Sequence, residues 1–118
     1  MKSRRIRFDE QTLEPVVAHD GAGEVLFRRV LTARDGSALD FVDMTVVPPG
    51  CSVGVHTHEG DEEEHYFIFA GEGRMTLEDE AIAVTAGDLV INRAGGTHAL
   101  ENTGSQPLRM VVWQARHR

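Results

Sequence analysis

Residues 50–71 read GCSVGVHTHEGDEEEHYFIFAG, and this stretch carries the strongest pattern in the chain. His56 and His58 are separated by one residue, and Glu64 follows them across a short acidic segment. Because side chains at positions i and i+2 of a strand point to the same face, both imidazoles aim one way. If a second strand begins near Glu64 and returns beside the first, its carboxylate meets the two imidazoles. Two nitrogens and one oxygen that converge in this way indicate a site for a divalent metal.

Composition limits the class of protein. The chain has 118 residues, 41% of them hydrophobic and 26% charged, which is typical of one globular domain over residues 1–118. The formal net charge of −7 argues against a nucleic-acid or anionic-membrane partner. It leaves an anionic small molecule open, because a bound metal reverses the local sign of charge.

The termini and the cysteine count bear on the compartment. The basic start of the chain has no apolar segment behind it, and no apolar run is long enough to span a membrane. We therefore expect no signal peptide and a cytoplasmic location. The single cysteine, Cys51, excludes an intramolecular disulfide, and no base is spaced to activate its thiol.

Short strands separated by turn signals account for the rest of the chain. Pro48-Pro49-Gly50 ends one of them, because proline cannot donate to a ladder and glycine permits the turn. Residues 1–14 form a basic N-terminal arm, with a short strand or an exchanging segment within it. Without a helical period, this pattern predicts an all-β sandwich or barrel. The expected strands cover 15–18, 25–33, 39–47, 53–58, 64–70, 74–77, 81–84, 89–92, 97–102 and 108–114.

A second cluster lies in residues 87–102, which read GDLVINRAGGTHALEN. His98 follows Gly95-Gly96-Thr97, and these glycines allow a sharp entry into the next strand. His98 and Asn102 share one face if that strand is regular. A third imidazole at the same depth would complete a set of three nitrogens and one oxygen.

The two stretches resemble the paired motifs of the cupin superfamily. The first motif is matched by Gly50, by the pair His56 and His58, by Glu64, and by Gly71, with six residues between Glu64 and Gly71. Five residues separate His58 from Glu64, one more than the motif usually has, whereas Glu63 would restore that gap and spoil the spacing to Gly71. We assign Glu64, because strand register matters more than loop length.

The second motif is matched at every spacing by Gly87, Gly95, His98 and Asn102, and Arg93 stands where a proline is expected. The resemblance implies a double-stranded β-helix, the jelly-roll barrel of the cupin type, usually as a homodimer. It also implies one divalent transition metal per chain (Fe, Mn, Ni, Zn, Co or Cu). The implied ligands are His56, His58, Glu64 and His98.

Such a ligand set leaves positions on the metal for a bidentate oxygen ligand, such as a carboxylate with a neighbouring carbonyl or hydroxyl. One hypothesis is a metal-dependent enzyme of the dioxygenase, isomerase, decarboxylase or cyclase type, acting on a small oxygenated substrate. The alternative is a barrel that binds a small molecule or a metal–ligand complex without turnover. The candidates for substrate contact are Tyr66, Arg93 and Glu63.

Other residues receive structural interpretations. His65 points away from Glu64 on a regular strand, so we expect it at the surface or in an interface. Phe67 and Phe69 share that face as core or dimer contacts. His19 and His117 have no spacing that predicts a role.

Overall fold

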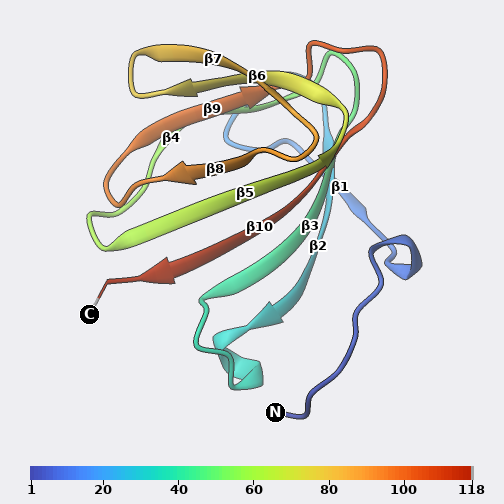
Figure 1. Cartoon of the computed structure of the whole chain (residues 1–118), viewed down its shortest axis with the longest axis vertical. Helices are drawn as coiled ribbons and strands as arrows, with labels where there is room; N and C mark the ends of the chain where they lie inside the picture. Colours follow the sequence, from blue (N-terminus) through green and yellow to red (C-terminus); the bar gives the residue numbers. More distant parts are fainter. Residues whose placement is uncertain (118) are drawn as a thin grey trace.

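Two antiparallel sheets face each other and enclose the interior of the barrel (Figure 1). The structure is a computed structural model and describes residues 1–117. One sheet has the strand order β1-β2-β3-β10-β5-β8 and the other β4-β9-β6-β7. The strands are β1 (Glu14–Val16), β2 (Val25–Thr32), β3 (Phe41–Val47), β4 (Ser52–Thr57), β5 (Glu62–Ala70), β6 (Glu72–Leu77), β7 (Glu80–Thr85), β8 (Leu89–Asn92), β9 (Thr97–Glu101) and β10 (Leu108–Arg116).

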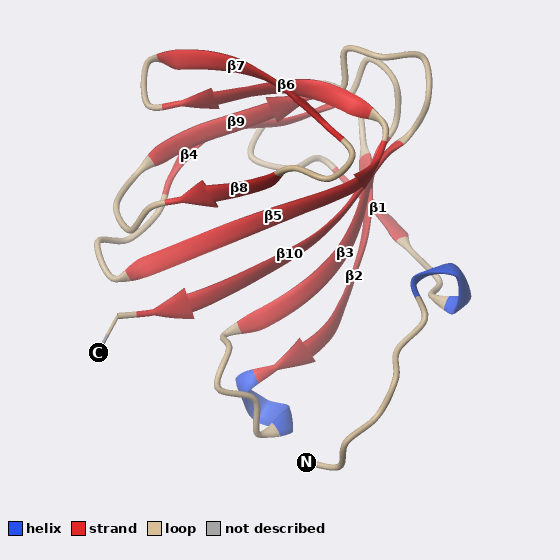
Figure 2. Cartoon of the chain, in the orientation of Figure 1, coloured by secondary structure: helices blue, strands red, loops and turns tan. Residues whose placement is uncertain are grey.

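Strands and loops make up nearly all of the described chain, as Figure 2 shows. The helical segments within residues 1–117 are two single 3₁₀ turns, Phe8–Glu10 and Ala33–Asp35. The all-β barrel predicted from the sequence is therefore confirmed. No helix in this part of the chain is long and apolar enough to cross a membrane.

The acidic segment is more ordered than the sequence suggested. We expected the strand to begin at residue 64, but β5 already begins at Glu62. Glu62 and Glu63 lie opposite Arg116 and Ala115 of β10, which extends beyond the expected end at Gln114. Arg116 at the end of β10 also forms ion pairs with Asp61 and Glu62, and opposite charges across a ladder favour strand pairing.

The N-terminal arm forms no strand before Glu14. The Phe8 ring packs edge-on against Phe69 at a centroid distance of 5.0 Å. Further along, β1 pairs with β2, so that Val16 lies opposite Val25. Residues 14–19 therefore lie against the barrel of their own chain.

The core lies between the sheets. Its least exposed side chains come from both of them, with Ile68 and Met110 on one side and Met75 and Leu100 on the other. Burying such apolar side chains on both inner faces holds the sheets together, at about 1.5–3 kcal/mol for each fully buried side chain. The inward positions of β5 alternate with outward ones, and this alternation sets which side chains reach the interior.

Candidate metal centre

Four side chains with metal-ligand chemistry converge inside the barrel. One donor atom each from His56, His58, Glu64 and His98 lies within 4.8 Å of all the others. His56 belongs to β4, and the next inward residue, His58, follows the end of that strand. The register of β4 with β9 places His98 beside them, since His56 lies directly opposite His98 in this pairing. Glu64 enters from β5 in the facing sheet.

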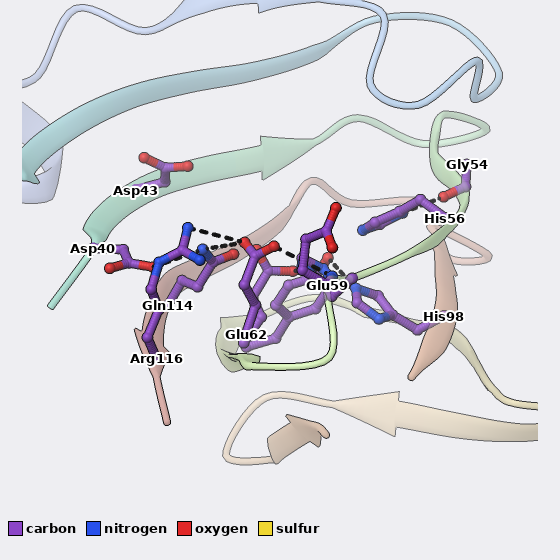
Figure 3. A network of polar contacts seen from close by, with 12 residues as sticks. Asp40, Asp43, Gly54, His56, Glu59, Glu62, His98, Gln114 and Arg116 are labelled. Carbon is purple, nitrogen blue, oxygen red and sulfur yellow. Dashed lines mark hydrogen bonds and ion pairs between the residues drawn. The ribbon is translucent and has the colours of Figure 1, made fainter. Parts of the chain in front are cut away.

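The donor atoms point toward one another. Glu64 Oε1 lies 3.2 Å from His98 Nε2 and 3.1 Å from His58 Nε2. The His56 Nδ1–H donates to the carbonyl oxygen of Gly54 at 2.8 Å, as Figure 3 shows. This hydrogen bond fixes the imidazole tautomer and leaves Nε2 available to an ion.

The charges of the group suit a cation. Burial alone would raise the pKa of Glu64, but the contacts with His58 and His98 outweigh it and lower the pKa to about 2. Burial lowers the pKa of His56 to about 4, so this imidazole is neutral near pH 7. The adjacent Glu64 carboxylate raises the pKa of His58. The group therefore offers an ionised carboxylate together with imidazole nitrogens.

One orphaned atom tests whether a metal fits. His58 Nε2 is buried and makes no hydrogen bond of acceptable geometry, although it faces the Glu64 carboxylate. Buried polar atoms are rarely left unsatisfied, and a divalent ion would satisfy this one. Three imidazoles and a carboxylate are suitable ligands for several transition metals. The residues present therefore fit such an ion, and the four are positioned to bind it.

A cavity of about 320 Å³ reaches the group of four at His56 and Glu64. Most of its wall is apolar. Its lining consists of Val16, Val17, Ala18, His19, Val25, Phe27, Asp43, Thr45, Val53, His56, Glu64, Tyr66, Met110 and Val112.

The three residues predicted to contact substrate lie in different places in the structure. Tyr66 lines the cavity, and its hydroxyl lies 3.3 Å from His98 Nε2. Arg93 is exposed and pairs with Glu78 at 2.9 Å, away from the cavity wall. Glu63 turns outward to His65, at 2.6 Å between Oε2 and Nε2. Strand alternation explains the position of Glu63, and the ion pair explains that of Arg93, so neither placement supports substrate contact.

His19 was missed by sequence reasoning. Its ring stacks on His56 with centroids 3.6 Å apart and planes 9° from parallel. The loop that carries it crosses β4 so closely that a Cβ on Gly54 would lie 2.0 Å from the His19 carbonyl oxygen. A glycine inside a strand marks such close backbone approaches, so Gly54 was the available signal.

Gln114 was predicted only as the end of a strand. Its side chain is 5% exposed, and its Nε2 donates to Asp40 at 2.9 Å and to Glu62 at 2.6 Å (Figure 3). Gln114 lies opposite Glu64 in the pairing of β10 with β5. It therefore ties the acidic start of β5 to the wall beside the four-residue group.

Asp43 is a further polar residue of the cavity wall that sequence reasoning did not single out. Its carboxylate accepts hydrogen bonds from Arg29 at 2.9 and 3.1 Å. Burial raises the pKa of Asp43, and Arg29 offsets part of that effect.

The fold is a two-sheet antiparallel barrel, and three imidazoles and a carboxylate converge inside it. These features place the protein in the class of β-barrels that are competent to bind a metal. A family model described as the Cupin domain matches residues 43–114, which is more than half of the chain, and the chain belongs to this family. The resemblance inferred from the two motifs is thereby confirmed.

Known proteins extend the similarity beyond the matched segment. The chain is 39% identical over 94 residues to an "Oxalate-binding protein" of Thermotoga maritima, which covers 78% of this chain and 76% of that protein. It is 29% identical over 113 residues to an uncharacterised protein of Methanocaldococcus jannaschii, covering 94% and 85% of the two chains. A crystal structure of a "predicted oxalate decarboxylase" from Thermotoga maritima superposes with a TM-score of 0.90 at 31% identity. That match covers 97% of this chain and all of the other.

Proposed function

We propose that this cupin is a divalent-metal-dependent enzyme that acts on a small organic acid with a second oxygen next to its carboxylate. The observation that carries the proposal is the convergence of four donor atoms beside a cavity that His56 and Glu64 line. His56, His58, Glu64 and His98 would hold the ion. A divalent ion there would act as a Lewis acid that polarises the oxygens of the ligand.

Titratable groups beyond the four favour turnover over simple binding. Burial raises the pKa of Tyr66 well above its usual value, so its hydroxyl stays protonated and donates hydrogen bonds. Asp43 is our candidate for proton transfer, because it is an acidic side chain at the cavity whose pKa is raised by burial and partly lowered by Arg29. Both residues line the cavity. Decarboxylation and isomerisation move a proton to or from carbon. Both reaction types use side chains that donate hydrogen bonds or transfer protons.

The relatives support the same substrate class. The names given to a relative and to a similar solved structure, both from Thermotoga maritima, refer to oxalate, an acid with adjacent oxygens. The word "binding" in one of these names also favours a second candidate function, which is a barrel that holds the acid without turnover.

The test is metal analysis followed by binding and turnover assays. Protein purified without chelator is expected to carry close to one divalent transition metal per chain, and His56→Ala should lose it. Metal-loaded protein should then bind oxalate or a 2-oxo acid and release labelled product, while Asp43→Asn binds and fails to turn over. Binding with no turnover of any acid would favour the binding module. Absence of metal after loading would refute both candidates.

We also propose that the chain forms a homodimer through the outer face of the six-stranded sheet. Phe67 and Leu89 lie opposite each other there and are 39% and 49% exposed, and the neighbouring Ile91 is 57% exposed. Contiguous exposed apolar side chains of this kind mark interaction surfaces. Light scattering should give twice the chain mass, and Ile91→Lys should shift it toward the monomer. A monomeric wild-type protein would refute the proposal.

A further inference from the structure

The cavity is much larger than a minimal bidentate ligand requires. The cavity has a volume of about 320 Å³, which is far more than one or two water molecules require. Oxalate consists only of two joined carboxylates and would leave most of this space unfilled. The part of the cavity beyond the four-residue group therefore has a separate role in recognition.

The wall of that part is mostly apolar, although Thr45 and Asp43 of β3 also line it. Val25 and Phe27 of β2 contribute to it, as do Met110 and Val112 of β10, whose side chains reach it from a neighbouring region of the same sheet. Residues 16–18 complete it from β1 and the following loop. Ligand sites of this kind place a few polar groups at one end and hydrophobic side chains along the rest.

Charge on the wall disfavours a second free carboxylate. Among the described residues that line the cavity, none is a lysine or an arginine. Arg29 approaches from outside the lining and is bound to Asp43 by two hydrogen bonds. Because Arg29 is already paired with Asp43, the lining described above offers a second carboxylate no lysine or arginine to bind.

We propose that the preferred ligand is a 2-oxo or 2-hydroxy monocarboxylic acid with a branched or aromatic apolar side chain. The two oxygens of its head lie at the group formed by His56, His58, Glu64 and His98. Its side chain lies along the apolar wall. This inference rests on the proposed function and deepens it by naming the substrate class.

Phe27 is the position where this preference can be altered with least damage to the fold. Its side chain lines the cavity but is not part of the buried core cluster. The adjacent residue of β2, Leu26, points to the other face and does not line the cavity. Leu26→Ala is therefore a matched control for Phe27→Ala.

The experiment is calorimetric binding of four acids to protein loaded with Mn²⁺. They are oxalate, pyruvate, 4-methyl-2-oxopentanoate and 2-oxoglutarate. The branched acid should bind at least tenfold more tightly than pyruvate, because its additional carbons are buried against the wall. It should also bind more tightly than oxalate and 2-oxoglutarate. Phe27→Ala should reduce the advantage over pyruvate about tenfold, with oxalate affinity and metal content unchanged, and Leu26→Ala should preserve it.

This experiment distinguishes failure of the apolar-tail inference from failure of the proposed metal-dependent function. If the loaded protein binds oxalate or 2-oxoglutarate as tightly as the branched acid, the apolar-tail inference is overturned and the metal-dependent function stands. An unchanged preference in Phe27→Ala would also overturn the inference. If the protein takes up no Mn²⁺ and binds none of the acids, the proposed function fails and this inference fails with it.

Discussion

Consecutive residues of β5 lie on its inner and outer faces and differ in burial and in the residues they contact. Glu64 points inward, is 6% exposed and meets two imidazoles, whereas Glu63 points outward to His65. Further along the strand, Ile68 is fully buried and Phe67 is 39% exposed. A shift of one residue in register would exchange every one of these roles. The chemistry of the site thus depends as much on register as on the residue types present.

The largest expected contrast is between an inward and an outward histidine. His58→Ala should abolish stoichiometric metal binding, because it removes one of four donors, and His65→Ala should leave the metal content unchanged. Both variants should keep the β-sheet circular dichroism of the wild type, since the apolar core is untouched. Metal content is measured by elemental analysis after dialysis. A full complement of metal in His58→Ala would place the site elsewhere.

The apolar positions of β5 give the next contrast. Ile68→Ala removes a fully buried side chain and should lower the free energy of unfolding by about 2–5 kcal/mol. Phe67→Ala should cost the isolated chain less, because Phe67 is partly exposed. Denaturant unfolding at low protein concentration measures both, so that any association contributes little. Equal losses would show that the outer face is covered.

The two neighbouring glutamates sharpen the comparison at the site. Glu64→Gln should weaken metal binding about 100-fold, since a neutral amide replaces the ionised ligand, and Glu63→Gln should change it less than twofold. Competition with a chromogenic chelator gives both affinities. The reverse order would mean that the register is wrong by one residue.

The pH dependence of stability gives the smallest contrast, between two inward histidines. In metal-free protein the pKa of His56 is lowered to about 4, so its stabilising contribution is present above pH 6.5 and is lost as pH falls toward 4. The pKa of His58 is raised, so its contribution is present below pH 6.5 and is lost as pH rises through its folded-state pKa.

Replacing each of these histidines with glutamine should therefore change the slope of stability against pH in opposite directions. His56→Gln should destabilise the protein more at pH 8 than at pH 5, and His58→Gln more at pH 5 than at pH 8. Thermal unfolding in the presence of chelator measures the slopes. Parallel slopes in the two variants would contradict the assigned environments.

Local pattern was sufficient for part of this architecture. The alternation of strands and turns predicted the all-β barrel, and the i and i+2 spacing predicted that His56 and His58 share a face. Register favoured Glu64 over Glu63, and the structure brings Glu64 to the imidazoles. Each of these predictions depends on residues close together in the chain.

The rest depends on contacts between distant segments. His19 reaches His56 only because a loop crosses β4, and Gln114 reaches Glu62 only because β10 pairs with β5. Arg93 follows the inward Asn92 of β8 and pairs with Glu78, which lies in the turn between β6 and β7 of the other sheet. The spacing of residues within a single segment cannot predict these contacts.

The measurement that tests the central claim most directly is anomalous diffraction from a crystal of the metal-loaded protein, recorded at the absorption edge of the ion. We predict one strong peak per chain, within about 2.0–2.3 Å of a nitrogen from each of the three histidines and of a Glu64 carboxylate oxygen. A crystal with no peak at this group, or with its peak elsewhere in the chain, would contradict the claim that these four residues bind a metal.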